Sequence, residues 1–264
     1  MASKKKFTAW CVGAALVAAS SAASAAGEAL YVYSTIDAFL TGAYDGDLTV
    51  RDMSAKGNFG LGTFNRLDGE MIVLDGICYH VRADGSVTVA DPSDKIPLVY
   101  VVPFVPSSTF EIAPGGADRP LAEVESLIDA RLPNKNLFYA VEVKGDFTGV
   151  TTRAIAPQVR PYRPLSEVAK TQVLFKREAV SGSLVGFRSP GFSKGVSVPG
   201  WHWHFISTGR DYGGHVISGG LSRGVVKSAA IRQFDVELPS TDDFANADQT
   251  QDRSKELHQV ETGR

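Results

Sequence analysis

The segment GWHWHFISTGRDYGGHV, residues 200–216, contains three of the five histidines in the chain. His202 and His204 are separated by one tryptophan. In an extended strand, residues two positions apart project from the same face and lie about 6–7 Å apart along the backbone. Two imidazoles at this spacing can bind one metal ion, for which zinc–nitrogen distances are about 2.0–2.1 Å. The spacing therefore predicts a metal site on a β-strand.

A third imidazole follows at a distance that suits a returning strand. His215 comes after FISTGRDYGG, a segment long enough to turn and run back beside the first strand. Three neutral imidazoles leave a fourth coordination position open, which is typical of catalytic zinc rather than structural zinc. We predict His202, His204 and His215 as metal ligands. The alternative is that each histidine pairs with backbone or a carboxylate.

The hydrophobic pattern predicts a mixed α/β fold in which strands dominate and position these histidines. Trp201 and Trp203 are expected on the opposite strand face, where they can fill a core. The Asp-Gly pair in ADGS, residues 83–86, predicts a tight hairpin. The other expected elements are strands from Gly57 onward, a helix over 120–133, a hairpin turning at residues 144–146, a proline-rich linker over 156–165, a helix over 166–177, and short glycine-bounded strands up to Leu238.

The first 26 residues resemble a secretory signal peptide. Three lysines at residues 4–6 precede a short apolar run over 9–19, and small residues follow up to Ala25. We expect removal of residues 1–26 and export of the mature chain, either to the periplasm or out of the cell. No other stretch approaches the ~20 apolar residues needed to cross a bilayer, so the mature chain is expected to have no membrane span.

Charge and cysteine usage limit the possible partners further. The net charge of −2 gives no electrostatic footprint for nucleic acid. Cys78 is the one cysteine left after the signal segment, so an intrachain disulfide is excluded, and a buried, apolar role is expected for its side chain.

Five segments together resemble the acetolactate decarboxylase family. These are STIDAFLTGAYDGDLTV, GNFGLGTFNRLDGEMIVLDGICY, VTTRAIAPQVRPYRPLSEV, SGSLVGFRSPGF and the histidine segment, and they cover essentially the whole mature chain in this order. The resemblance implies a mixed-sheet N-terminal lobe with helices over 27–160. It also implies a half-open β-barrel-like C-terminal lobe over 161–264 that carries the metal and ends in a polar tail. A homodimer joined through the N-terminal sheets is implied as well.

The resemblance also implies the activity and further site residues. Family members convert 2-acetolactate, a 2-hydroxy-3-keto acid, to acetoin and carbon dioxide, and they hold Zn²⁺ on three histidines. Matching the family's motifs assigns Thr63 and Glu70 in GTFNRLDGE, Arg153 in TTRAI, and Glu261 near the C-terminus. Glu256 lies close enough in sequence to be an alternative to Glu261.

These residue types suit a decarboxylation. Losing carbon dioxide leaves an electron pair on carbon, and a cation bound to the neighbouring ketone can stabilise that charge. The guanidinium of Arg153 can bind a carboxylate through two parallel hydrogen bonds and stays charged. Either Glu70 or Glu261 can deliver the proton or contact the metal. The residue types alone leave zinc, manganese, iron and cobalt as possible metals.

Two other functions are compatible with the histidines. A cupin-type metal dioxygenase also places His-x-His on a strand, but its pattern has a glutamate three or four residues later, where this chain has Thr208 and Gly209. A non-enzymatic exported metal-binding protein would favour a closed site or a histidine-rich loop, and the sequence contains neither.

Overall fold

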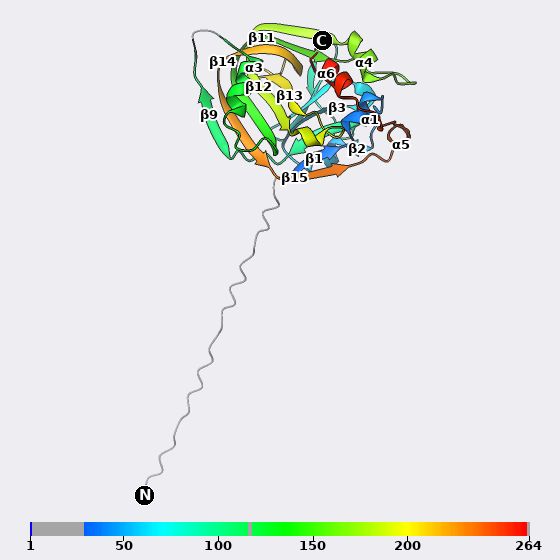
Figure 1. Cartoon of the computed structure of the whole chain (residues 1–264), viewed down its shortest axis with the longest axis horizontal. Coiled ribbons are helices and arrows are strands. Elements are labelled where there is room, and N and C mark those ends of the chain that lie inside the picture. The colour runs from blue at the N-terminus through cyan, green and yellow to red at the C-terminus, as the bar shows by residue number, and fades with distance from the viewer. Residues whose placement is uncertain (2–28, 116–117, 263–264) are drawn as a thin grey trace.

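The computed structural model describes residue 1 and residues 29–115 and 118–262. The signal peptide predicted over 1–26 falls almost entirely outside these residues and stays a prediction. Within the described part of the chain, no helix is both long and apolar enough to cross a membrane. Figure 1 shows the strands gathered into two groups, with β9, β12, β13 and β14 on one side and β1, β3 and β15 on the other.

The first group is a seven-stranded mixed sheet in the order β15-β1-β8-β3-β4-β5-β6. Its strands pair antiparallel, except that β1 pairs parallel with β15. The hairpin predicted at ADGS is confirmed as the turn between β5 and β6. The strands are β1 (Ala29–Tyr33), β3 (Phe59–Thr63), β4 (Glu70–Leu74), β5 (Ile77–Val81), β6 (Val87–Val89), β8 (Leu98–Val102) and β15 (Gln233–Glu237).

The second group is a six-stranded sheet that curves into a partial barrel. β14 pairs with β11, β11 with β12, β12 with β13, and β13 pairs back with β14. The predicted fold class, β-dominated with a mixed sheet and a half-open barrel, is confirmed. The strands are β9 (Ser108–Ile112), β10 (Arg119–Pro120), β11 (Phe138–Ala154), β12 (Val173–Ser189), β13 (Gly200–Ser207) and β14 (Gly213–Ile231).

The long barrel strands correct two sequence predictions. A hairpin at residues 144–146 was wrong, because Lys144 pairs with both Ser183 and Val225 inside a continuous β11. Pairing on both edges overrides the turn preference of Gly-Asp. The helix predicted over 166–177 is confirmed only in its first part. The observed helical residues are α4 (Leu165–Val168) and η2 (Ala169–Thr171), and β12 then begins at Val173, so the prediction was wrong for the rest of the range.

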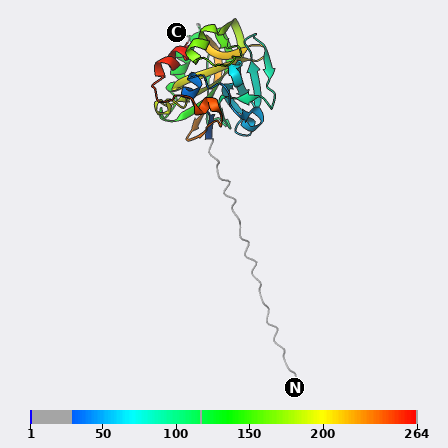
Figure 2. The same cartoon turned by 90° about the vertical axis from the view of Figure 1, so that its right-hand side faces the viewer.

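Short helices cover the outside of the sheets. The helix predicted over 120–133 is confirmed as α3, whose buried Val124 and Ile128 pack into the barrel. Figure 2 places α6 on the outside of the molecule. The remaining elements are α1 (Ile36–Leu40), α2 (Val50–Ser54), α3 (Leu121–Asp129), α5 (Asp242–Ala245), α6 (Ser254–Thr262), η1 (Asn65–Leu67), η3 (Gly191–Ser193), β2 (Leu48–Thr49) and β7 (Lys95–Ile96).

The largest hydrophobic core lies between the two sheets. It joins side chains of the first sheet, such as Leu61 and Ile72, to side chains of the barrel, such as Val185 and Ile206. The two sheets do not divide the chain at residue 160. β9 to β11 precede that residue and belong to the barrel, whereas β15 follows it and belongs to the first sheet. The division into lobes over 27–160 and 161–264 stays a prediction.

The pairing of β12 with β13 sets the direction of the WHWH side chains. Gly186 of β12 lies directly opposite Trp203 of β13. A Cβ atom at Gly186 would lie 2.0 Å from Cε3 of Trp203. The indole therefore occupies the space that any other side chain at this position would take. Trp203 is buried in the barrel core, as predicted, which leaves the histidines on the face toward the first sheet.

Replacing Gly186→Ala should therefore destabilise the fold. We expect a loss of about 1–3 kcal/mol in the free energy of unfolding, because overpacking forces the indole to move. Gly191→Ala is the matched control, since a Cβ there meets nothing within 4 Å. Urea unfolding of both variants measures the difference. Equal stability of the two variants would contradict the packing described.

Candidate metal centre and active site

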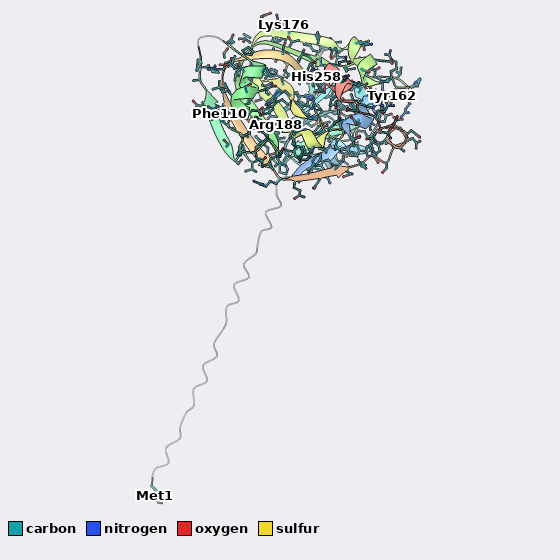
Figure 3. The ribbon with its side chains drawn as sticks, in the orientation of Figure 1. Met1, Phe110, Tyr162, Lys176, Arg188 and His258 are labelled. Atoms are coloured by element: carbon teal, nitrogen blue, oxygen red, sulfur yellow. The ribbon has the colours of Figure 1, made fainter. Side chains whose placement is uncertain are left out.

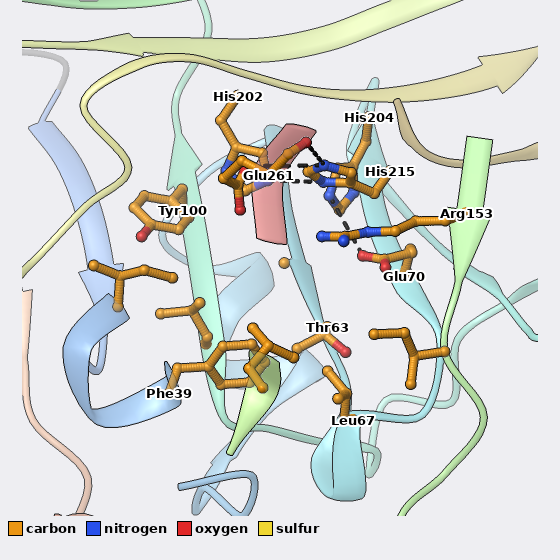
Figure 4. Close-up of a pocket in the computed structure, with 15 residues that line it drawn as sticks. Phe39, Thr63, Leu67, Glu70, Tyr100, Arg153, His202, His204, His215 and Glu261 are labelled. Atoms are coloured by element: carbon orange, nitrogen blue, oxygen red, sulfur yellow. Dashed lines mark hydrogen bonds and ion pairs between the residues drawn. The ribbon is translucent and has the colours of Figure 1, made fainter. Parts of the chain in front are cut away.

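The three predicted histidines meet on one face of β13 and β14. His204 lies directly opposite His215 in the antiparallel pair, so both side chains project to the same side. His202, two residues earlier on β13, joins them there. One ligand nitrogen from each of the three residues lies within 4.8 Å of the others. Figure 4 shows the three rings converging.

A glycine allows β14 to approach two strands at this point. Gly214 has a φ of +130°, and a Cβ atom there would lie 2.4 Å from the carbonyl oxygen of Arg153. A side chain at Gly214 would push β14 away from β11. On β14 the next residue, His215, pairs with His204 of β13 and also with Arg153 of β11. His215 therefore places β11, which carries Arg153, beside the pair of imidazoles.

Hydrogen bonds fix the ring nitrogens that face the centre of the cluster. Nδ1 of His204 donates to the carbonyl oxygen of Met71 at 2.8 Å, which leaves Nε2 free to bind a metal. Nε2 of His215 lies 3.3 Å from the carbonyl oxygen of Glu261 and donates to it, which leaves Nδ1 free. Nδ1 of His215 lies 3.2 Å from Nε2 of His202.

The arrangement fits a divalent metal ion. Two ligand nitrogens of a tetrahedral zinc site with bonds of about 2.0–2.1 Å lie roughly 3.3 Å apart, close to the 3.2 Å between the nitrogens of His202 and His215. Burial, with a smaller effect of the Arg153 charge, lowers the pKa of His202 to about 3. Burial also lowers the pKa of His204 and of His215 well below the usual range. The imidazoles are therefore neutral, which is the form that binds metals.

Two carboxyl groups flank the histidines. Oε2 of Glu70, at the start of β4, lies 3.5 Å from Nε2 of His204. Oε2 of Glu261, on α6, lies 3.7 Å from Nε2 of His202. Burial raises the pKa of Glu70 to about 8 and that of Glu261 to about 7, although the Arg153 charge opposes both shifts. Both groups lie near enough to contact a bound metal or its ligand.

Arg153 is buried beside these carboxyl groups. Its Nη1 donates to the carbonyl oxygen of Val260 at 2.5 Å and to Oε1 of Gln172 at 3.2 Å. The bond to Val260 ties the guanidinium to α6, one residue before Glu261. Within the described residues, Nε of Arg153 is buried and has no hydrogen-bond partner. A buried donor without a partner is costly, so this N–H is available to an anionic ligand.

The inner cavity brings together all seven side chains predicted from the sequence, and an apolar wall faces them. Thr63 lies at the end of β3, where its hydroxyl donates to the carbonyl oxygen of Gly69 at 2.6 Å and holds the turn before Glu70. The lining residues are Thr63, Glu70, Arg153, His202, His204, His215 and Glu261, with Ile36, Phe39, Gly62, Leu67, Leu98, Tyr100, Ile155 and Leu165.

The apolar wall was missed by sequence reasoning. Phe39, Leu67 and Tyr100 are buried like ordinary core residues. Figure 4 shows Phe39 and Leu67 across the cavity from the histidines, whereas Tyr100 lies beside His202, with ring centroids 6.1 Å apart. An apolar residue in a buried strand or helix has the same sequence pattern whether it lines a core or a pocket. No local signal could therefore have marked this wall.

The other two histidines, the alternative carboxylate and the cysteine lie apart from the site. His80 is buried against Phe64, with ring centroids 3.9 Å apart, and its Nε2 donates to the carbonyl oxygen of Asp68. His258 is exposed on the outside of α6 (Figure 3). Glu256, the alternative to Glu261, pairs with Arg253 at 3.1 Å and does not line the cavity. Cys78 is buried, as predicted.

The fold and this site define a β-sheet protein with a candidate metal centre between its two sheets. The family model described as alpha-acetolactate decarboxylase matches residues 30–251. The chain is 42% identical to the alpha-acetolactate decarboxylase of Methanosarcina mazei, with 89% of this chain and 81% of that protein covered. It is 39% identical to that of Bacillus subtilis, with 83% and 84% covered.

Solved structures give the same result. The crystal structure of alpha-acetolactate decarboxylase from Bacillus subtilis strain 168 matches with a TM-score of 0.85 and 36% identity. The match covers 89% of this chain and 99% of that one. The chain therefore belongs to the alpha-acetolactate decarboxylase family, as the sequence motifs predicted. Membership does not favour the cupin-type dioxygenase or the non-enzymatic metal-binding protein.

Removing one imidazole should abolish metal binding. Removing a group that only hydrogen-bonds to a metal ligand typically lowers metal affinity ~10–100-fold. His204→Ala removes a ligand itself, so its loss of metal affinity should be at least that large. His258→Ala is the control, because His258 is exposed on α6. Metal content per chain, measured by mass spectrometry after dialysis, should fall only in His204→Ala, with circular dichroism confirming that both variants fold. Full metal content in His204→Ala would argue against the centre.

Proposed function

We propose that the protein is a metal-dependent carboxy-lyase that converts 2-acetolactate to acetoin and carbon dioxide. Family membership supports the reaction. The observation that carries the proposal for this chain is the meeting of the histidine cluster, Arg153, Glu70 and Glu261 in one buried cavity. These groups match the charge that develops when a 2-hydroxy-3-keto acid loses its carboxylate.

The metal and Arg153 have complementary roles. A divalent ion held by His202, His204 and His215 would supply a Lewis acid for the ketone and hydroxyl oxygens of the substrate. The partnerless Nε–H of Arg153 would bind the substrate carboxylate and place it beside the cluster. The bond from that carboxylate to the carbinol carbon breaks, its electron pair stays on the remaining four-carbon unit, and carbon dioxide leaves.

The chain must then return one proton to the four-carbon unit. Glu70 and Glu261 are the groups within reach, since each lies within 4 Å of a histidine nitrogen of the cluster. A proton delivered from a fixed carboxyl reaches one face of the substrate and yields one acetoin enantiomer. Thr63 acts indirectly, because its hydroxyl holds the turn that places Glu70.

We also propose three finer features. Zinc suits a cluster of three nitrogen donors with a free position. A homodimer joined through the N-terminal sheets follows from the family resemblance. Export follows from the basic and apolar segments at residues 1–26.

The direct test is the reaction itself. Purified mature protein should release carbon dioxide and acetoin from 2-acetolactate. A chelator should abolish turnover, and Zn²⁺ added back should restore it. Product is measured by chiral gas chromatography and carbon dioxide by a coupled assay. Metal-loaded protein that produces no acetoin would overturn the proposed function.

Arg153→Lys tests the binding of the carboxylate. Lysine keeps the charge but lacks the planar fork, so we expect unchanged metal content and a decrease of roughly 10²–10³ in kcat, the usual cost of one lost charge-stabilising donor. Arg223→Lys is the control, because Arg223 forms an exposed ion pair with Asp146. Unchanged turnover in Arg153→Lys would remove the guanidinium from the mechanism.

A further inference from the structure

The strands that carry the histidines separate immediately beside the cluster. β13 and β14 pair over three residue pairs, the last of which joins His204 to His215. Before His204, β13 continues along β12, and after His215, β14 continues along β11. The space between the diverging strands is a second cavity of about 470 Å³, which we name the outer chamber. Its lining residues are Pro120, Leu121, Ala122, Glu125, Trp201, His202, Trp203, His215, Val216, Ile217, Ser218, Gly219, Glu261 and Thr262.

The outer chamber reaches the candidate metal centre directly. His202, His215 and Glu261 line both the outer chamber and the inner cavity. The two spaces therefore adjoin at these three side chains. A molecule in the outer chamber can contact the cluster without passing through either sheet.

The sizes of the two spaces favour the outer chamber as the route to the metal. The inner cavity has about 40 Å³ of free space, and one water molecule needs about 10–15 Å³ by the same measure, so only a few water molecules fit there. A five-carbon keto acid is several times larger. The outer chamber, at about 470 Å³, accommodates it without rearrangement of the core.

Two stacked indoles build one wall of the outer chamber. The rings of Trp201 and Trp203 lie 4.8 Å apart and nearly parallel, at 9°. Nε1 of Trp203 donates to Oε1 of Glu125 on α3 at 2.9 Å, which fixes the inner ring. Trp201 packs on that fixed ring, and its Nε1 is buried without a partner among the described residues. The wall offers a rigid apolar surface.

A second cavity beside α6 is the competing route to the metal centre. A cavity of about 320 Å³ lies there, lined by Arg153, Ser166, Ala169, Lys170, Gln172, Gln259 and Val260. Of the site residues it reaches only Arg153, whose Nη1 is already bonded to Val260 and Gln172. It gives no contact with the histidines.

We infer that the 2-hydroxy-3-keto acid reaches the metal centre through the outer chamber, along the wall that Trp201 forms. The inference rests on the proposed function for the identity of the substrate. The route itself depends only on the metal centre, so it can be tested with a small planar chelator.

The experiment fills the outer chamber in one variant and the competing cavity in another. Ser218→Trp places an indole in the outer chamber from an exposed position on β14, and Ser166→Trp makes the same change in the competing cavity. Cobalt-substituted protein is mixed with dipicolinate, and the second-order rate of cobalt removal is followed by visible absorbance. The kcat/KM for acetolactate is measured in parallel.

Ser218→Trp should lower both the removal rate and kcat/KM by an order of magnitude, with cobalt content unchanged. Ser166→Trp should change neither. Adding Trp201→Ala to Ser218→Trp should reopen the chamber and recover most of the removal rate, which a general folding defect would not do.

Unchanged removal in Ser218→Trp would overturn the inference, whatever Ser166→Trp does, and so would a double variant as slow as Ser218→Trp alone. If the wild-type protein releases no carbon dioxide, the proposed function fails, and the removal rates still decide the route.

Discussion

The structure depends on the register between β13 and β14. His204 faces His215 across the strand pair, and His202 shares their face because side chains alternate along a strand. A slip of one residue would turn His202 and His204 into the barrel core and bring the tryptophans to the metal face. The fit of Trp203 over Gly186 and the glycine at position 214 both oppose such a slip.

The site also depends on bringing distant segments together. β3 and β4 supply Thr63 and Glu70, the barrel supplies Arg153 and the histidines, and the last helix supplies Glu261. Leu257 and Val260 bury the inner face of α6, and the hydrogen bond from Arg153 to Val260 fixes its end. The same burial keeps the imidazoles neutral and raises the pKa of both carboxyl groups. The packing and the chemistry of this site therefore have one cause, the exclusion of water between two sheets.

Sequence reasoning succeeded where the signal was local. The alternation in WHWH, the Asp-Gly hairpin and the amphipathic helix now seen as α3 each depend on neighbours within a few residues. It failed at residues 144–146 and 173–177, where pairing with strands far away in sequence decides the conformation. The approach of Glu261 depends on how the last helix packs, so only the family resemblance pointed to it. The apolar wall with Leu67 and Tyr100 had no signal in the sequence.

The central claim is that one cation lies among the three imidazoles. A crystal structure of the metal-loaded protein with anomalous diffraction at the zinc absorption edge tests it most directly. We expect one peak at about 2.0–2.1 Å from Nε2 of His202, Nε2 of His204 and Nδ1 of His215. A peak elsewhere, or zinc-loaded protein with no peak among these nitrogens, would contradict the account.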